Sequence, residues 1–377
     1  MMTSTPGPHP PSLPAHGGQL RSIARQFHVR EDTLIDFSAS ISPYPPPQQV
    51  LTRLLRKAAD AKFLSAYPDL DYEDLKAAIS IYAGVPSEAV CVGNGVMPIL
   101  DAVLRALDIR RCLVVQPCFG GYARSLGASR TEAVAFPLQP EQGFALPLDP
   151  LLCSLVEHRC DAVLLANPHS PSGIAAAPEL LRSLCRQAAA LKVRVLLDEA
   201  FIDYEPESSL CFFAASRPGT IVFRSLTKFF AIPALRVAYA VTNPEAVETI
   251  GRCVAEWPIG SLASAAAIEL LACEGDHRSV RENNAREREA LLHSLQKLGI
   301  AAYPSRANYL LIRLRSDAAG LALWRSLIVE HGIVSRCCRN FEGLDARYLR
   351  FSIRTREDND RLLHGLQFSL RGASEFA

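Results

Sequence analysis

The sequence predicts an α/β fold with a mainly parallel sheet in a large domain and a second, smaller α/β domain at the C-terminal end. Short apolar runs of strand length alternate with helix-like segments, and they occupy residues 112–116, 162–166, 193–197, 220–223 and 237–241. Strands that are apolar throughout are typical of a parallel sheet covered by helices on both faces. We expect residues 178–190 to form one of the covering helices.

The chain divides into three expected parts. Residues 1–45 form an N-terminal arm, of which the proline-rich segment 1–14 is expected to be disordered. The large domain spans 46–262 and the small C-terminal domain spans 263–377. A turn at 258–261 introduces a long helical pattern that reaches about residue 297, and strand-like segments follow at 308–313 and 348–354.

Composition indicates an ordinary soluble globular protein. Of the 377 residues, 49% are hydrophobic and 21% are charged, and the net charge is +1. This balance gives no reason to expect nucleic acid or an anionic membrane as a partner. The N-terminus has no basic start, and no apolar run approaches the roughly 18 residues that span a bilayer. We therefore expect a cytoplasmic protein.

The 11 cysteines are scattered along the chain without a CxxC pair. Several lie in apolar runs, where a thiol behaves as a small hydrophobic side chain. We expect reduced, structural cysteines and no metal site.

The segment from Ser225 to Arg236 is the most informative part of the sequence. Lys228 follows an apolar strand and precedes an almost wholly apolar run. A lysine at the edge of a dry pocket loses its charge easily and can condense with a carbonyl group, although a solvated helix end is the alternative. Ser225, Thr227 and Arg236 are the donors that a phosphate needs. A lysine beside a phosphate clamp suggests pyridoxal phosphate as the cofactor.

Polar residues follow three strands of the expected sheet: Asn167, Asp198 and Lys228. Parallel sheets bind ligands beyond the carboxyl ends of their strands. Asp198 ends a buried run, so it needs a cationic partner, which is either a protonated pyridine nitrogen or a structural arginine. Asn167 lies in a Pro- and Gly-rich loop, where its amide either donates to a phenolate oxygen or forms a turn.

Three further features complete the expected site. Gly95 and Val96 open an apolar helix, where free backbone amides bind phosphate, although tight turns use the same residues. Phe119 either stacks on a flat ring or packs in the core. Arg350 and Arg354 lie four residues apart, which on one strand face would let them receive a substrate with a carboxylate and a phosphate. A solvated basic edge is the alternative.

Together these motifs resemble fold-type I pyridoxal-phosphate enzymes of the aminotransferase class I/II superfamily. The resemblance runs from about His16 to the C-terminus and rests on four motifs, Asn167-Pro…Gly173, Asp198-Glu-Ala-Phe201, Ser225-Leu-Thr-Lys228 and Arg236. The chain looks closest to the threonine-phosphate decarboxylases of cobalamin biosynthesis, with histidinol-phosphate aminotransferases as near relatives.

The resemblance implies a homodimer, a small phosphorylated amino acid or amine as substrate, and a role for each matching residue. Lys228 would bond covalently to the cofactor, Asp198 would pair with its pyridine nitrogen, Asn167 would bind its phenolic oxygen and Phe119 would stack on its ring. The cofactor phosphate would lie among Gly95, Val96, Ser225, Thr227, Arg236 and, from the second subunit, Tyr67. Arg354 would bind the substrate carboxylate, with His16 and Arg350 near the substrate phosphate and Asn167 beside the substrate.

The chain departs from the family pattern around the substrate. Val96-Met97-Pro98 replaces acidic and hydroxyl residues, Ser40 and Ser42 replace asparagines, and His169 replaces another asparagine. Phe201 stands where many aminotransferases have a tyrosine, which favours decarboxylation of L-threonine O-3-phosphate. Transamination of histidinol phosphate or a related amine is the alternative, and a non-catalytic regulatory or scaffold protein is the third hypothesis.

Overall fold

The computed structural model describes residues 13–371. Of the segment 1–14, which was expected to be disordered, only residues 13 and 14 lie within this range.

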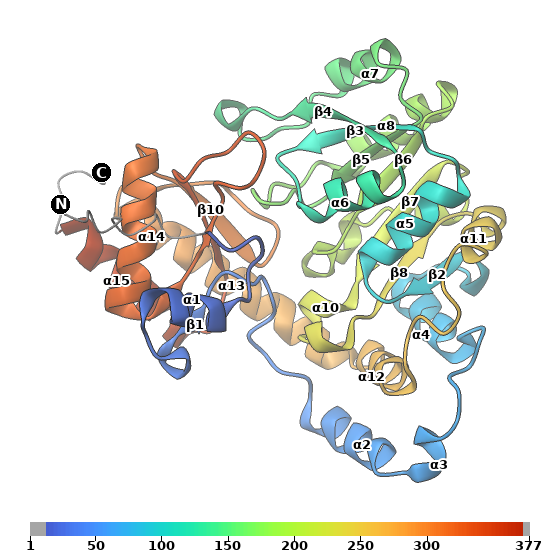
Figure 1. Cartoon of the computed structure of the whole chain (residues 1–377), viewed down its shortest axis with the longest axis horizontal. Helices are drawn as coiled ribbons and strands as arrows, with labels where there is room; N and C mark the ends of the chain where they lie inside the picture. Colours follow the sequence, from blue (N-terminus) through green and yellow to red (C-terminus); the bar gives the residue numbers. More distant parts are fainter. Residues whose placement is uncertain (1–12, 372–377) are drawn as a thin grey trace, which may run out of the picture.

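The central sheet of the large domain consists of β2 (Val90–Gly93), β3 (Arg111–Gln116), β4 (Glu132–Pro137), β5 (Ala162–Ala166), β6 (Arg194–Asp198), β7 (Thr220–Ser225) and β8 (Ala238–Val241). Their spatial order is β2-β8-β7-β6-β5-β3-β4 (Figure 1). Every pair is parallel except those of β8, which runs antiparallel to β7 and β2. The expected mainly parallel sheet is confirmed.

Helices cover both faces of this sheet because successive strand residues point to opposite sides. In β6, Val195 and Leu197 join one apolar cluster, whereas Leu196 joins the other. The first cluster also takes side chains from α2 (Gln48–Ala58), α4 (Glu73–Ala83), α7 (Leu148–Glu157), α8 (Pro178–Ala190), α9 (Cys211–Ala215), α10 (Leu226–Phe229) and α12 (Ser261–Leu271). The second takes them from α5 (Val96–Ala106), α6 (Gly121–Ala128) and α11 (Pro244–Gly251). The helix expected over residues 178–190 is confirmed by α8.

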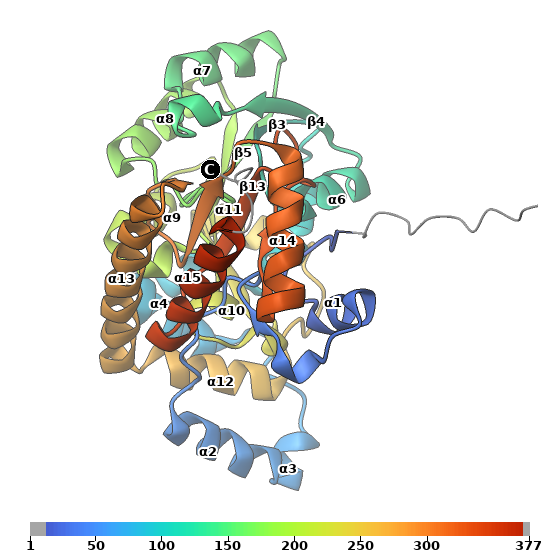
Figure 2. The same cartoon turned by 90° about the vertical axis from the view of Figure 1, so that its left-hand side faces the viewer.

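The small domain has its own antiparallel sheet, in the order β12-β13-β10-β9. Its strands are β9 (Ala301–Ala302), β10 (Tyr309–Arg313), β12 (Arg336–Cys337) and β13 (Tyr348–Ser352). It is packed against α13 (Glu274–Lys297), α14 (Asp317–His331) and α15 (Arg356–Arg371) (Figures 1 and 2). The apolar core of this domain lies between the sheet and these helices, around Leu323, Trp324 and Phe351.

The N-terminal part of the chain lies against the small domain. The helix α1 (Leu20–Phe27) contributes Ile23 to the small-domain core, and Phe37 joins it from the following segment. The strand β1 (Ile35–Asp36) pairs in parallel with β11 (Ile333–Val334). The chain then continues into α2, which packs against α12, and into α3 (Ala61–Leu64) (Figure 1). Short 3-10 turns cover Glu31–Thr33, Ser87–Ala89, Pro140–Gln142, Ile202–Tyr204, Pro206–Ser208 and Pro233–Leu235.

Two expected elements have different limits in the structure. The long helical pattern that follows the turn at 258–261 is broken at Cys273 into α12, which is apolar and buried, and α13, which is highly charged. The strand expected at 348–354 ends at Ser352, so Arg354 lies beyond it and the two arginines do not share a strand face. Among residues 13–371, no helix combines the length and the apolar character that crossing a bilayer requires.

Candidate active site

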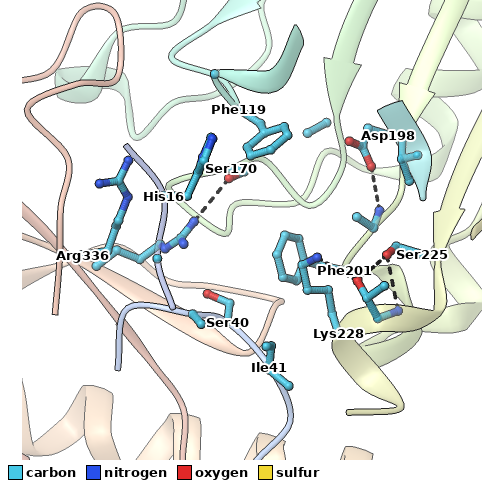
Figure 3. Close-up of a pocket in the computed structure, with 18 of the residues that line it drawn as sticks. His16, Ser40, Ile41, Phe119, Ser170, Asp198, Phe201, Ser225, Lys228 and Arg336 are labelled. Atoms are coloured by element: carbon cyan, nitrogen blue, oxygen red, sulfur yellow. Dashed lines mark hydrogen bonds between the residues drawn. The ribbon is translucent and has the colours of Figure 1, made fainter. Parts of the chain in front are cut away.

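A cavity of about 450 Å³ opens beyond the carboxyl ends of β6 and β7. Its walls come from these strand ends, from the N-terminal residues 15–17 and 38–41, and from the small-domain sheet around residues 336–350. Figure 3 shows Asp198, Ser225 and Lys228 on one side of the cavity, with His16 and Arg336 on the other. The volume suits a small-molecule ligand.

Lys228 supplies the amine of the cavity. It lies on α10, which begins directly after β7 and is capped by Ser225. Its Nζ donates a 2.8 Å hydrogen bond to Oγ1 of Thr227. Burial lowers the pKa of Lys228 to about 8, helped by the nearby charges of Arg236 and Arg350 and opposed by Asp198. The neutral, nucleophilic amine is therefore accessible at mildly alkaline pH.

Asp198 supplies a buried carboxylate at the end of β6. Its Oδ1 accepts from the backbone N–H of Ala200 at 2.9 Å, and its Oδ2 accepts from the hydroxyl of Tyr122 at 2.6 Å. Burial raises the pKa of Asp198, while the hydrogen bonds from Tyr122 and Ala200 and the charge of Lys228 lower it. Within residues 13–371 no arginine forms a salt bridge with Asp198, so this carboxylate is available to a cationic ligand group.

The start of α5 and the end of β7 form an anion cradle. Gly95 precedes α5 with φ +88°, and a Cβ at this position would lie 2.7 Å from Nη2 of Arg236. The hydroxyl oxygens of Ser225 and Thr227 are 2.7 Å apart. Val96 is the first residue of α5, so its backbone N–H has no intrahelical acceptor. A helix N-terminus with hydroxyls and a guanidinium is the chemistry that binds a phosphate.

Asn167 and Phe119 offer contacts for a flat ring with an oxygen substituent. Oδ1 of Asn167 accepts from the N–H of Ala176 at 2.8 Å, whereas its buried Nδ2 has no partner among the described residues. Asn167 follows the lining residue Ala166 and itself lines a smaller neighbouring cavity of about 180 Å³. Phe119 lines the main cavity with 38% of its surface exposed, and its ring centroid lies 5.6 Å from that of His16.

These observations fit pyridoxal phosphate. The unpaired amide of Asn167 matches a phenolic oxygen, Asp198 matches a protonated ring nitrogen and the cradle at Gly95 matches a phosphate. Lys228 lies in the same cavity with its pKa lowered toward neutrality.

Two arginines of the small domain line the opposite wall. Arg336 on β12 and Arg350 on β13 are direct cross-strand partners, so their side chains leave the sheet on the same face. They are only 6% and 9% exposed. Neither forms a salt bridge within the described part of the chain. Like charges placed opposite each other are destabilising, which indicates an anionic ligand between them.

The two guanidinium groups differ in their present partners. Arg336 donates to the carbonyl oxygens of Pro14 and Ala15 at 2.7 and 2.8 Å and to Oδ1 of Asn340 at 2.7 Å. Arg350 makes two long contacts, each 3.4 Å, to Oγ of Ser170 and to the carbonyl oxygen of Ser38. Its buried Nε has no partner among the described residues. Arg350 therefore retains most of its donor capacity.

Two residues expected at the site lie away from this cavity. Arg354 donates from Nε to Oδ2 of Asp358 at 2.9 Å and from Nη1 to the carbonyl oxygen of Asp36 at 3.1 Å. Tyr67 is 81% exposed and stacks on Trp257, with ring centroids 4.8 Å apart. Neither residue lines the cavity of its own chain, whereas His16, Val96, Phe119, Asp198, Ser225, Thr227, Lys228, Arg236 and Arg350 do.

Sequence reasoning missed Tyr122 and Arg336. Tyr122 comes three residues after Phe119 and lies on the first turn of α6, from which its hydroxyl reaches Asp198. Arg336 stands in a strand of only two residues, where no alternation of apolar side chains marks the segment. Of the departures noted around the substrate, Ser40, Val96, Met97 and Phe201 line the cavity.

His169 has a different environment from that of the cavity residues. Its Nε2 donates to the carbonyl oxygen of Pro117 at 2.8 Å, so its Nδ1 accepts from the hydroxyl of Ser172 at 2.7 Å. Burial lowers the pKa of His169 to about 4. The neutral ring therefore holds two loops together and does not face the main cavity.

Comparison with known proteins identifies relatives along nearly the whole chain. The family model for aminotransferase class I and II matches residues 32–366. The threonine-phosphate decarboxylase of Salmonella typhimurium is 34% identical over 364 residues, which cover 95% of this chain and 97% of that protein. Histidinol-phosphate aminotransferase 2 of Archaeoglobus fulgidus is 28% identical over 337 residues, which cover 89% of this chain and 92% of that protein.

The structural comparison agrees with this result. The crystal structure of histidinol-phosphate aminotransferase from Sinorhizobium meliloti in complex with pyridoxal-5'-phosphate has a TM-score of 0.83 at 20% identity. The match covers 93% of this chain and 94% of that one. The chain therefore belongs to the aminotransferase class I and II family, and its fold is that of the fold-type I pyridoxal-phosphate enzymes.

Proposed function

We propose that the protein is a decarboxylase that removes CO2 from L-threonine O-3-phosphate and forms (R)-1-amino-2-propanol O-2-phosphate. Membership of the family makes the chain a pyridoxal-phosphate enzyme, as the resemblance implied. The observation that carries the substrate class is a pair of buried arginines that have no salt-bridge partner among the described residues, Arg336 and Arg350. A substrate with a carboxylate and a phosphate would neutralise both.

The cofactor would be held by the residues that the sequence singled out. The anion cradle of Gly95, Val96, Ser225, Thr227 and Arg236 would bind its phosphate, and Phe119 would cover its ring. Asn167 would donate to its phenolic oxygen, and Asp198 would keep its ring nitrogen protonated. When bound, pyridoxal phosphate supplies a carbonyl that condenses with an amine and a ring that withdraws electrons from bonds at the adjacent carbon.

The small domain would orient the substrate. We assign the substrate carboxylate to Arg350, because its guanidinium is buried and weakly satisfied, and the phosphate to Arg336 together with His16. Arg354 is already bonded to Asp358 and to the carbonyl of Asp36, which makes it less available than the sequence suggested. Two fixed anion contacts hold the bond from Cα to the carboxylate in one orientation.

The remaining residues would exclude water and manage the proton. Ile41, Phe201 and Phe341 give the cavity an apolar wall. When CO2 leaves, the substrate Cα loses one of its four bonds, and it must receive a proton in place of the carboxylate. Nζ of Lys228 is the group for this step, because burial and the neighbouring arginines lower its pKa to about 8, so it gives up a proton readily.

Transamination is the second candidate, because the same arginine pair would also receive the two carboxylates of glutamate as amino donor. The relatives of the chain include histidinol-phosphate aminotransferases. Phe201 supports decarboxylation, since it places no hydroxyl in the cavity at a position where the resemblance expects a tyrosine in many aminotransferases.

The two reactions separate in one experiment. The purified protein, loaded with pyridoxal phosphate, is given L-threonine O-3-phosphate carrying a labelled carboxylate, and labelled CO2 is trapped. In parallel it is given histidinol phosphate with 2-oxoglutarate, and glutamate is measured. Release of labelled CO2 in the first reaction supports the proposal. Glutamate formation without CO2 release would replace it by transamination, and neither product would exclude both substrates.

We also propose that the working form is a homodimer. Tyr67 is exposed, is held by Trp257 and lies outside the cavity of its own chain. The bond from Nε1 of Trp257 to the carbonyl oxygen of Pro68 holds the same loop in place at 3.1 Å. Tyr67 would therefore reach the cofactor phosphate in a second copy of the chain.

A further inference from the structure

Tyr309 lies directly beneath Arg350 in the small-domain sheet. It is the first residue of β10 and is fully buried. In the antiparallel pairing of β10 with β13, Tyr309 is opposite Ser352 and Leu311 is opposite Arg350. Tyr309 is therefore the diagonal neighbour of Arg350 on the same sheet face, a distance that aromatic and long side chains bridge. The guanidinium carbon of Arg350 is 4.7 Å from the centroid of the Tyr309 ring.

The ring supports an arginine that has only weak hydrogen bonds. The two hydrogen bonds of its guanidinium are both 3.4 Å long, and its Nε is unpaired among the described residues. Attraction between a guanidinium and an aromatic face is strongest where both are desolvated, as they are here. A contact with the aromatic ring uses no N–H group in a hydrogen bond to oxygen, so the donors of the arginine stay available to an anion.

Tyr309 itself is fixed from two other directions. Its hydroxyl donates to the carbonyl oxygen of His169 at 3.1 Å. The Phe201 ring forms an edge-to-face pair with it at a centroid separation of 5.0 Å and an interplanar angle of 84°. Both contacts come from the large domain, next to Asp198 and Asn167. The ring therefore connects the arginine of one domain with the loops of the other.

We propose that Tyr309 is a positioning residue for the substrate: its ring holds Arg350 in the orientation that binds the substrate carboxylate, and its hydroxyl fixes the ring against the large domain. This inference rests on the proposed function for the identity of the anion. The ring contacts Arg350 directly, whereas the hydroxyl is linked to it only through Ser170, so the two groups can be tested separately.

Two substitutions separate these roles. Tyr309→Leu removes the aromatic face and should raise KM for L-threonine O-3-phosphate roughly ten- to thirtyfold, with a smaller change in kcat. Tyr309→Phe keeps the face and should leave KM within about twofold of the wild type. The affinity for pyridoxal phosphate should be unchanged in both variants, because no contact of Tyr309 involves the cradle. Tyr348→Leu is the matched control: Tyr348 is also a buried tyrosine of this sheet that contacts arginine side chains, Arg313 and Arg347, but neither of these arginines lines the cavity, whereas Arg350 does.

An unchanged KM in Tyr309→Leu would overturn the proposal, as would an equal rise in Tyr309→Leu, Tyr309→Phe and Tyr348→Leu. If Tyr309→Leu does not fold, as judged by thermal unfolding, Tyr309→Met repeats the test with a longer and more flexible side chain that adapts to the space left by the ring. If the wild type binds L-threonine O-3-phosphate without turning it over, the proposed function fails, and the dissociation constants of the same variants still test Tyr309.

If the wild type does not bind L-threonine O-3-phosphate, succinate serves as a probe with two carboxylates. A loss of succinate affinity in Tyr309→Leu alone supports the proposal. Equal succinate affinity in all variants would overturn it.

Discussion

The hydroxyl of Tyr122 donates a 2.6 Å hydrogen bond to Oδ2 of Asp198, although the two residues are 76 positions apart in the chain. The donor is neutral, so it orients the carboxylate without cancelling its charge. A buried carboxylate without a partner tends to become protonated, because burial raises its pKa. The hydrogen bond from Tyr122 lowers the pKa of Asp198 and so favours the charged form, which can pair with a cationic ligand group.

Replacing Tyr122 by Phe should therefore weaken the binding of pyridoxal phosphate. A hydrogen bond to a buried charged group contributes about 1.5–3 kcal/mol, which corresponds to a loss in affinity of at least about tenfold. The dissociation constant is measured by titrating apo-protein with the cofactor and following its absorbance. An affinity equal to that of the wild type would show that Tyr122 does not support Asp198.

Lys228 should make cofactor loading depend on pH. Its pKa is lowered to about 8, so the neutral amine that reacts with the cofactor carbonyl is depleted as the pH falls below this value. The rate at which apo-protein takes up pyridoxal phosphate should rise through a midpoint near pH 8 and level off above it. Stopped-flow absorbance measures this rate. Lys228→Ala should show no such phase and no turnover, and a pH-independent rate in the wild type would contradict the prediction.

Substitutions of Arg350 and Arg354, which the sequence analysis expected on one strand face, should differ in their effect on KM. Arg350→Ala should raise KM for L-threonine O-3-phosphate strongly, by the equivalent of about 2–5 kcal/mol, because a buried partner of a carboxylate is lost. Arg354→Ala should affect KM much less and should mainly lower the unfolding temperature, since it loses Asp358 and the carbonyl of Asp36. Steady-state kinetics and thermal unfolding of both variants decide the assignment. A larger rise in KM for Arg354→Ala than for Arg350→Ala would instead assign the substrate carboxylate to Arg354.

A shared active site predicts complementation between two inactive variants. Lys228→Ala lacks the amine, and Tyr67→Ala should bind the cofactor phosphate weakly. In a hybrid dimer of the two, one site would carry both substitutions and the other would carry none. Mixing the variants under conditions that exchange subunits should therefore restore part of the wild-type activity. No gain above the sum of the separate variants would argue that Tyr67 does not serve a second copy.

The buried ion pairs of Arg224 should contribute strongly to the stability of the fold. Arg224 precedes Ser225 and is 2% exposed, and it is paired with Asp203 and, at 3.8 Å, with Glu199. Arg224→Met would leave two buried carboxyl groups without their cation and should destabilise the protein by about 3–5 kcal/mol. Chemical denaturation measures the loss. The matched control is Arg252→Met, which removes an exposed pair with Glu248 and should change the stability by less than about 1 kcal/mol.

Much of the cofactor side of the site could be predicted from the sequence. Asn167, Asp198 and Ser225 lie at or directly after the ends of three adjacent strands, and their apolar runs are readable from local sequence. Neighbouring parallel strands end at the same edge of the sheet. Residues at their carboxyl ends therefore lie close together, and this does not depend on how the helices pack. Thr227 and Lys228 follow directly after β7, and Arg236 follows the next short turn, Pro233–Leu235, so short stretches of chain fix their relative positions.

The substrate side was decided by the tertiary structure. Arg336 and Arg350 face each other because β12 pairs with β13 in one register, and a strand of two residues has no pattern that would reveal it. Arg354 does not share their strand face because β13 ends two residues before it. Tyr122 meets Asp198, and Tyr309 meets Arg350, only after α6 and β10 are packed in place. Local sequence determines the strands and what stands at their ends, whereas contacts between distant segments depend on register and packing, which arise from the folded chain as a whole.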